Sequence, residues 1–112
     1  MKSNYYKLRC AVVEMFYETL REEDYTIGQA TSRCLVEFRR EVQGGKQEGL
    51  FVLSALLSRV ARHEPAILVD FMPEVTALRA LGKKPSCWKN VDPTAKERIK
   101  EDVRFVSEKA EP

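Results

Sequence analysis

The residues that could do acid–base or nucleophilic chemistry are few and scattered along the chain. His63 is the single histidine and lies in RHEP, where the C-terminal end of a helix favours a cation. Asp70 and Glu74 are four residues apart and could act as paired carboxylates, but an exposed acidic edge is the commoner explanation. The chain has no glycine-rich phosphate loop, no H-E-x-x-H and no G-x-S-x-G segment. These observations predict that the protein is not an enzyme.

The three cysteines do not predict a metal site or a disulfide framework. Cys10, Cys34 and Cys87 are widely spaced, odd in number and outside any C-x-x-C motif. One histidine in the whole chain leaves too few ligands for a zinc site. The chain opens on the polar segment MKSNYYKLR, and its longest apolar run is too short for a bilayer. We expect reduced thiols, no cofactor, no membrane association and a cytoplasmic location.

A basic segment around the single tryptophan is a candidate for contact with nucleic acid. It carries no acidic residue, and its members are Arg79, Lys83, Lys84, Trp88 and Lys89. Single strands are held by cations on their phosphates and by aromatic rings on their bases. The footprint is small, however, since the net charge of the chain is only +2, and Trp88 would equally well close one end of a bundle. A small nucleic-acid-associated regulator is therefore an alternative function.

The stretch that must position these residues is Leu50 to Ala61, LFVLSALLSRVA. It carries no charge from Leu50 through Ser58, and its apolar residues fit no two-residue alternation. About a dozen residues is long for a strand and ordinary for a helix. We predict a central helix over about Leu50–His63, apolar on most of its circumference and surrounded by other helices.

The flanking segments show the apolar spacing of amphipathic helices. The predicted helices cover Asn4–Glu22, Ile27–Val42, Pro65–Met72, Glu74–Leu81 and Pro93–Lys109, with an irregular segment over Gly82–Val91. Thr26 with Gln29 predicts a capping box, Pro73 a kink or restart, and Asp92 before Pro93 an N-cap. The sequence predicts an all-α fold, a single domain over residues 1–112 with five or six helices.

The first predicted helix carries two apolar rows. The row expected in the core is Tyr5, Leu8, Val12, Phe16 and Leu20, and the second row, about 100° round the helix, is Tyr6, Cys10, Val13 and Tyr17. The second row either packs against the last helix or faces a partner. As an interface, Tyr6, Val13 and Tyr17 would be rimmed by Glu14, Glu18 and Arg21, an aromatic and apolar patch with a charged edge.

Residues Tyr5 to His63 show a pattern that extends beyond single sites. An aromatic-rich first helix is followed by a short acidic turn, then by ATSRCLVEFRREV over residues 30–42, and then by the apolar helix. This pattern resembles the helical immunity proteins of bacterial polymorphic-toxin and contact-dependent growth inhibition systems. The resemblance covers roughly half of the chain, and the Pro73 break and GKKPSCWKNV have no counterpart in it. It implies a small cytosolic protein that binds one cognate toxin domain and blocks it without catalytic residues.

Together these observations predict a non-catalytic binding protein that neutralises one protein partner. The acidic residues Glu18, Glu22, Glu23 and Asp24 would suit a basic nuclease toxin, because they could occupy the surface that otherwise meets phosphates. A helical adaptor or a homodimer subunit is a further alternative.

Overall fold

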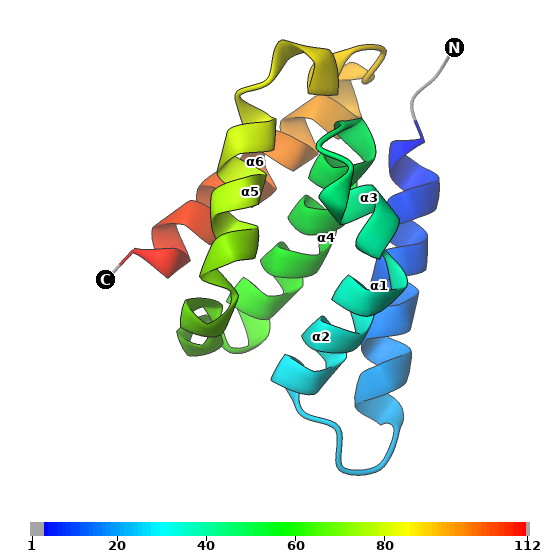
Figure 1. Cartoon of the computed structure of the whole chain (residues 1–112), viewed down its shortest axis with the longest axis vertical. Helices are drawn as coiled ribbons and strands as arrows, with labels where there is room; N and C mark the ends of the chain where they lie inside the picture. Colours follow the sequence, from blue (N-terminus) through cyan, green and yellow to red (C-terminus); the bar gives the residue numbers. More distant parts are fainter. Residues whose placement is uncertain (1–3, 112) are drawn as a thin grey trace.

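The chain folds into six α-helices and two short 3₁₀ helices over residues 4–111, the part that the computed structural model describes (Figure 1). The elements are α1 (Tyr5–Arg21), α2 (Ile27–Glu37), α3 (Arg39–Gln43), α4 (Gln47–His63), η1 (Pro65–Phe71), α5 (Met72–Gly82), η2 (Pro85–Trp88) and α6 (Pro93–Ala110). These residues contain no strand, which confirms the predicted all-α fold. Met1–Ser3 and Pro112, also part of the predicted domain, lie outside the described residues.

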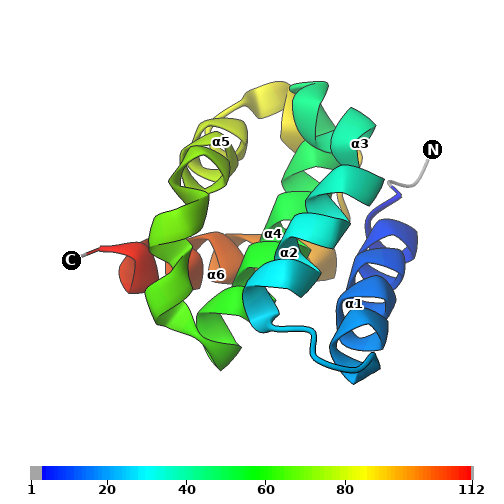
Figure 2. The same ribbon diagram turned by 60° about the horizontal axis from the view of Figure 1, so that its bottom comes forward.

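Helix α4 lies in the middle of the bundle, as the apolar stretch predicts. Every residue from Gly49 to Ser58 is buried, and α4 contacts all the other helices. Figures 1 and 2 both show α1 and α5 on opposite sides of α4, while α6 passes behind α4. The two serines inside it, Ser54 and Ser58, donate hydrogen bonds to the Phe51 and Ala55 carbonyls, so their hydroxyls are satisfied within the helix.

The helix ends follow the predicted capping chemistry. The Gln29 N–H donates to Thr26 Oγ1 at 3.1 Å, and the Thr26 N–H donates to Gln29 Oε1 at 2.8 Å, so the capping box is confirmed. Asp92 caps α6 by accepting from the Ala95 N–H.

On α1, Tyr5, Val12 and Phe16 of the predicted core row are fully buried. The burial of these three side chains packs α1 against α4.

The single helix predicted over Ile27–Val42 is wrong, because the chain breaks at Phe38 into α2 and α3. Phe38 has φ −102° and ψ 26°, outside the helical region. After the break, α3 packs against the start of α4. That packing is a tertiary contact, which the local spacing of apolar residues does not encode.

Two proline-led segments form 3₁₀ helices where the sequence predicts otherwise. The segment predicted as a helix over Pro65–Met72 is the 3₁₀ helix η1, and α5 restarts after Phe71, whose φ is −124°, rather than at Pro73. Pro73 therefore lies in the first turn of α5, where its missing N–H costs no helical hydrogen bond. The segment predicted as irregular, Gly82–Val91, contains η2.

Candidate functional site

The second apolar row of α1 lies at the surface. We call Tyr6, Cys10, Val13 and Tyr17 the tyrosine row; Tyr6 is 47% exposed, Cys10 is exposed, and Val13 and Tyr17 are half-buried. Helix α6 packs on α4, α5 and η1, and its N-terminal end reaches α1 through a 3.2 Å hydrogen bond from the Tyr6 hydroxyl to Asp92 Oδ2. The row is thus accessible, with only Tyr17 packed partly against the core.

A hydrogen bond to the central helix orients Tyr17. Its hydroxyl and His63 Nε2 share a hydrogen bond of 2.8 Å, and its ring meets the His63 ring edge to face at 5.6 Å. His63 also stacks on the buried ring of Phe16. The sequence places His63 correctly at a helix end but gives no sign of this pairing, because the two residues are 46 positions apart. His63 therefore positions an aromatic side chain of the row.

Four arginines gather beside the tyrosine row, around the half-buried Asp102 of α6. This arginine cluster consists of Arg9 from α1, Arg59 and Arg62 from α4, and Arg98 from α6. Burial raises the pKa of the Asp102 carboxyl, and the positive charges of the arginine cluster partly offset this by lowering the same pKa. Burial also lowers the pKa of Arg59, with a further lowering from Arg9. Within residues 4–111 the ion pairs are Arg33–Glu22 and Arg79–Glu111, so none of the four arginines lies within ion-pair distance of a carboxylate, and Arg62 lies over the Phe105 ring at 5.9 Å.

The acidic residues predicted for partner binding lie along the outer side of α1 and on the turn after it. Glu14, Glu18, Glu22, Glu23 and Asp24 are all exposed. Glu22 forms a 3.7 Å ion pair with Arg33 of α2, in which both side chains are about half exposed. Asp24 has a φ of 67° and so fixes the turn in a left-handed conformation. We define the acidic end as Glu18, Glu22, Glu23 and Asp24. It begins on α1 next to Tyr17 and extends onto the turn that follows the helix.

The segment around Trp88 is held in place by hydrogen bonds. The Trp88 indole N–H donates to the Gly82 carbonyl at 2.8 Å, which anchors η2 to the end of α5. Gln47, at the start of α4, donates its amide Nε2 to the carbonyls of Cys87 and Lys89 at 2.8 and 2.7 Å. This segment, predicted to be irregular, therefore has a defined conformation.

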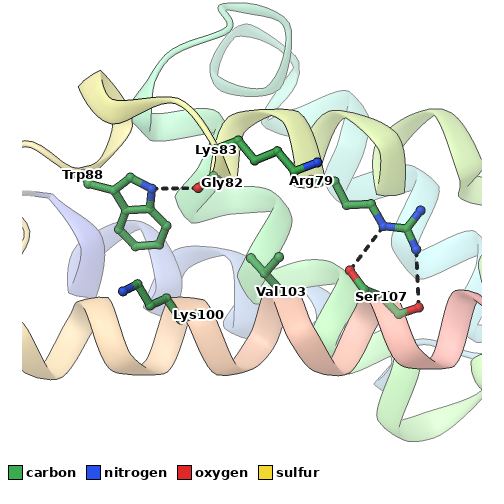
Figure 3. A pocket seen from close by; sticks show the side chains of 7 residues that line it. All are labelled: Arg79, Gly82, Lys83, Trp88, Lys100, Val103 and Ser107. Carbon is green, nitrogen blue, oxygen red and sulfur yellow. Dashed lines mark hydrogen bonds between the residues drawn. The ribbon is translucent and has the colours of Figure 1, made fainter.

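A cavity of about 380 Å³ lies between α5, η2 and α6, and we call it the Trp88 pocket (Figure 3). Its lining residues are Arg79, Gly82, Lys83, Trp88, Lys100, Val103 and Ser107. Figure 3 shows Trp88 and Lys100 at one end, Arg79 with Ser107 at the other, and Val103 between them. The Lys100 ammonium lies 6.0 Å from the centroid of the Trp88 ring, in cation–π range.

The five residues predicted to contact nucleic acid do not form one surface. Arg79, Lys83 and Trp88 meet in the pocket, whereas Lys84 turns away and donates its ammonium to the Gly45 carbonyl at 2.7 Å. Lys89 is exposed and is not among the lining residues. The sequence does not single out Lys100, Val103 and Ser107, because these residues belong to the following helix and reach the pocket only through the packing of α6 on α5.

Other kinds of site find little support in the described part of the chain. No group of three His, Cys, Asp or Glu side chains gathers there at a spacing suited to a metal ion. Cys34 and Cys87 are buried free thiols, and Cys10 is an exposed one. No helix within residues 4–111 has the length and hydropathy needed to cross a bilayer.

Comparison with known proteins identifies no relative of this chain. No family model matches it, and neither the curated proteins nor the solved structures give a significant match. The features that bear on its function are therefore the tyrosine row, the arginine cluster, the acidic end and the Trp88 pocket.

Proposed function

We propose that this chain is a non-catalytic binding protein that neutralises one cognate protein partner, as a toxin immunity protein does. The observation that supports this proposal is the tyrosine row, which stays accessible on α1 beside the arginine cluster. Tyrosine and arginine are the side chains that, with tryptophan, most often dominate the energy of protein interfaces. The acidic residues along the other side of the row add a charged rim.

The rigidity of α1 suits a tight inhibitor. The helix is fixed on α4 by the buried side chains of Tyr5, Val12 and Phe16, and Tyr17 is oriented by His63. A surface that is already ordered loses little conformational entropy when a partner binds. Stoichiometric inhibitors gain affinity in this way without any chemistry of their own.

Removing the aromatic groups of the row tests the proposal. We expect Tyr6→Ala combined with Tyr17→Ala to weaken binding of the partner by about 30-fold or more, since an interface hot spot contributes roughly 2 kcal/mol or more. The partner is first captured with the tagged chain from its native cells after nuclease treatment, and its affinity is then measured by calorimetry. The matched control is Val36→Ala, which removes an exposed apolar side chain (69% exposed) from α2 and should leave the affinity unchanged.

Thermal unfolding of the same variants distinguishes an interface from packing. The two tyrosines act as an interface if binding is lost while the midpoint of unfolding stays within a few degrees of the wild type. A loss of binding that only follows a large loss of stability would contradict this role. The partner's own activity must also fall to background at a one-to-one ratio; an active complex, or recovery of the chain only as a homodimer, would refute neutralisation.

The acidic end predicts fast association with a basic partner. We expect Glu18→Lys with Glu23→Lys to slow association about tenfold or more at low salt and less at high salt, because steering charges act mainly on the association rate. These two positions are chosen because Glu22 is paired with Arg33 and Asp24 has a left-handed backbone. Glu97→Lys with Glu108→Lys changes the net charge equally on exposed positions of α6 and serves as the control in stopped-flow measurements. Equal slowing by both pairs would remove the acidic end from the interface.

A further inference from the structure

The Trp88 pocket has the size of a site for one small molecule. Its volume of about 380 Å³ falls near the lower end of the range of ligand pockets, roughly 300–1,000 Å³. The indole of Trp88 and the Val103 side chain supply apolar walls. A space of this size accommodates a single ring with a head group and excludes a run of stacked bases.

The charges that line the pocket are cationic and only partly compensated. Arg79, Lys83 and Lys100 supply three positive charges, and the one acidic group within ion-pair distance is Glu111, at 3.3 Å from Arg79 Nη2. Neither lysine has an ion-pair partner among residues 4–111. The lysines lie on different helical segments, at the end of α5 and within α6, on the two sides of Val103 (Figure 3). Figure 3 shows the two ammonium groups directed apart, that of Lys83 toward Arg79 and that of Lys100 toward Trp88, so both flexible side chains must turn toward Val103 to meet one anionic group.

The walls of the pocket are ordered before any ligand enters. Arg79 donates from Nε to Ser107 Oγ at 3.2 Å and from Nη2 to the Ser107 carbonyl at 3.3 Å, which fixes its guanidinium against α6. The Trp88 ring is fixed by its N–H bond to Gly82. Only the two lysines must change rotamer on binding, so the entropic cost of forming the site is low.

We propose that the Trp88 pocket binds a small organic anion, one with a single anionic head group on a flat apolar body. The body packs on Val103 and the indole, and the head group accepts charge-assisted hydrogen bonds from Lys83 and Lys100. Arg79 contributes positive potential from the far end of the cavity. The pocket shares no residue with the tyrosine row, the arginine cluster or the acidic end, so this inference does not depend on the proposed function.

Trp88 itself provides the readout, because it is the only tryptophan in the chain. We use phenyl phosphate as the probe and follow Trp88 fluorescence together with the single indole N–H signal in the proton–nitrogen correlation spectrum. We expect saturable quenching and a shift of the indole signal. Phenol, which lacks the charge, and inorganic phosphate, which lacks the body, should each bind at least tenfold more weakly.

Lysine-to-methionine variants test the assigned cations, since methionine keeps most of the side-chain length without the charge. Lys83→Met and Lys100→Met should each weaken phenyl phosphate binding about tenfold, as the loss of a charge-assisted hydrogen bond implies. The matched control is Lys89→Met, in the same basic segment but outside the pocket, which should bind as the wild type does. Unchanged amide spectra away from the pocket show that each variant is folded.

Three results would overturn the proposal. An equal loss in Lys89→Met would show that only the net charge of the segment matters. Equal binding of phenol and phenyl phosphate would show an apolar cavity without anion recognition. Tighter binding of single-stranded oligothymidylate than of phenyl phosphate, weakened by Lys84→Met and Lys89→Met, would show that a nucleic-acid strand is the ligand.

Discussion

Replacing Gly49 by alanine is expected to lower the free energy of unfolding by about 1–3 kcal/mol, the usual cost of overpacking a core. A Cβ at this position would lie 2.8 Å from the Glu41 carbonyl oxygen and 3.2 Å from Leu81 Cδ1. The carbonyl is backbone, so relief requires α3 to move away from α4. Urea denaturation followed by circular dichroism measures the change.

Gly28→Ala is the matched control, because Gly28 is also helical but has room around it. The nearest atoms to its Cβ would be Thr26 Oγ1 at 3.8 Å and Ile67 Cδ1 at 4.0 Å, which are ordinary contact distances. Alanine is the better helix former by up to about 1 kcal/mol, so this variant should be as stable as the wild type or more so. Equal destabilisation by both substitutions would contradict a close approach at Gly49.

The sequence predicts the parts of this fold that depend on local chemistry. The uncharged apolar run that begins at Leu50 requires burial on all sides, and it forms the central helix of the bundle. Thr26 with Gln29 and Asp92 before Pro93 set helix starts by hydrogen bonds within a few residues, and both are found. Each signal lies within a single helix or at a single helix start, where sequence spacing and spatial contact coincide.

The features that the sequence does not predict depend on contacts between distant elements. The break at Phe38 accompanies the packing of α3 on α4, and nothing in the apolar spacing of residues 27–42 indicates it. The Trp88 pocket needs Lys100 and Val103 from α6, which meet Trp88 only because α6 packs on α5. The arginine cluster draws on α1, α4 and α6, so its members are recognisable only in space.

Alkaline pH is expected to destabilise the protein by several kcal/mol through two buried acids of the core. Burial raises the pKa of Tyr5 from 10.0 to about 12 and the pKa of Cys34 from 9.0 to about 12. The unfolded chain therefore releases these protons between pH 9 and 10, while the folded chain holds them until about pH 12. Because the unfolded state then binds fewer protons, this stabilisation is complete below pH 9 and is lost as the pH rises to 12.

Two substitutions isolate this effect from the other groups that titrate at high pH. Tyr5→Phe with Cys34→Ala should flatten the decline between pH 9 and 12, by up to about 1.4 kcal/mol per pH unit for each group. Tyr25→Phe with Cys10→Ala removes the same groups from exposed positions and should leave the decline as in the wild type. The Tyr5 hydroxyl is buried without a hydrogen-bond partner among the described residues, so Tyr5→Phe alone should not lower stability at neutral pH. A decline of wild-type steepness in the core double variant would show that neither buried acid controls alkaline unfolding.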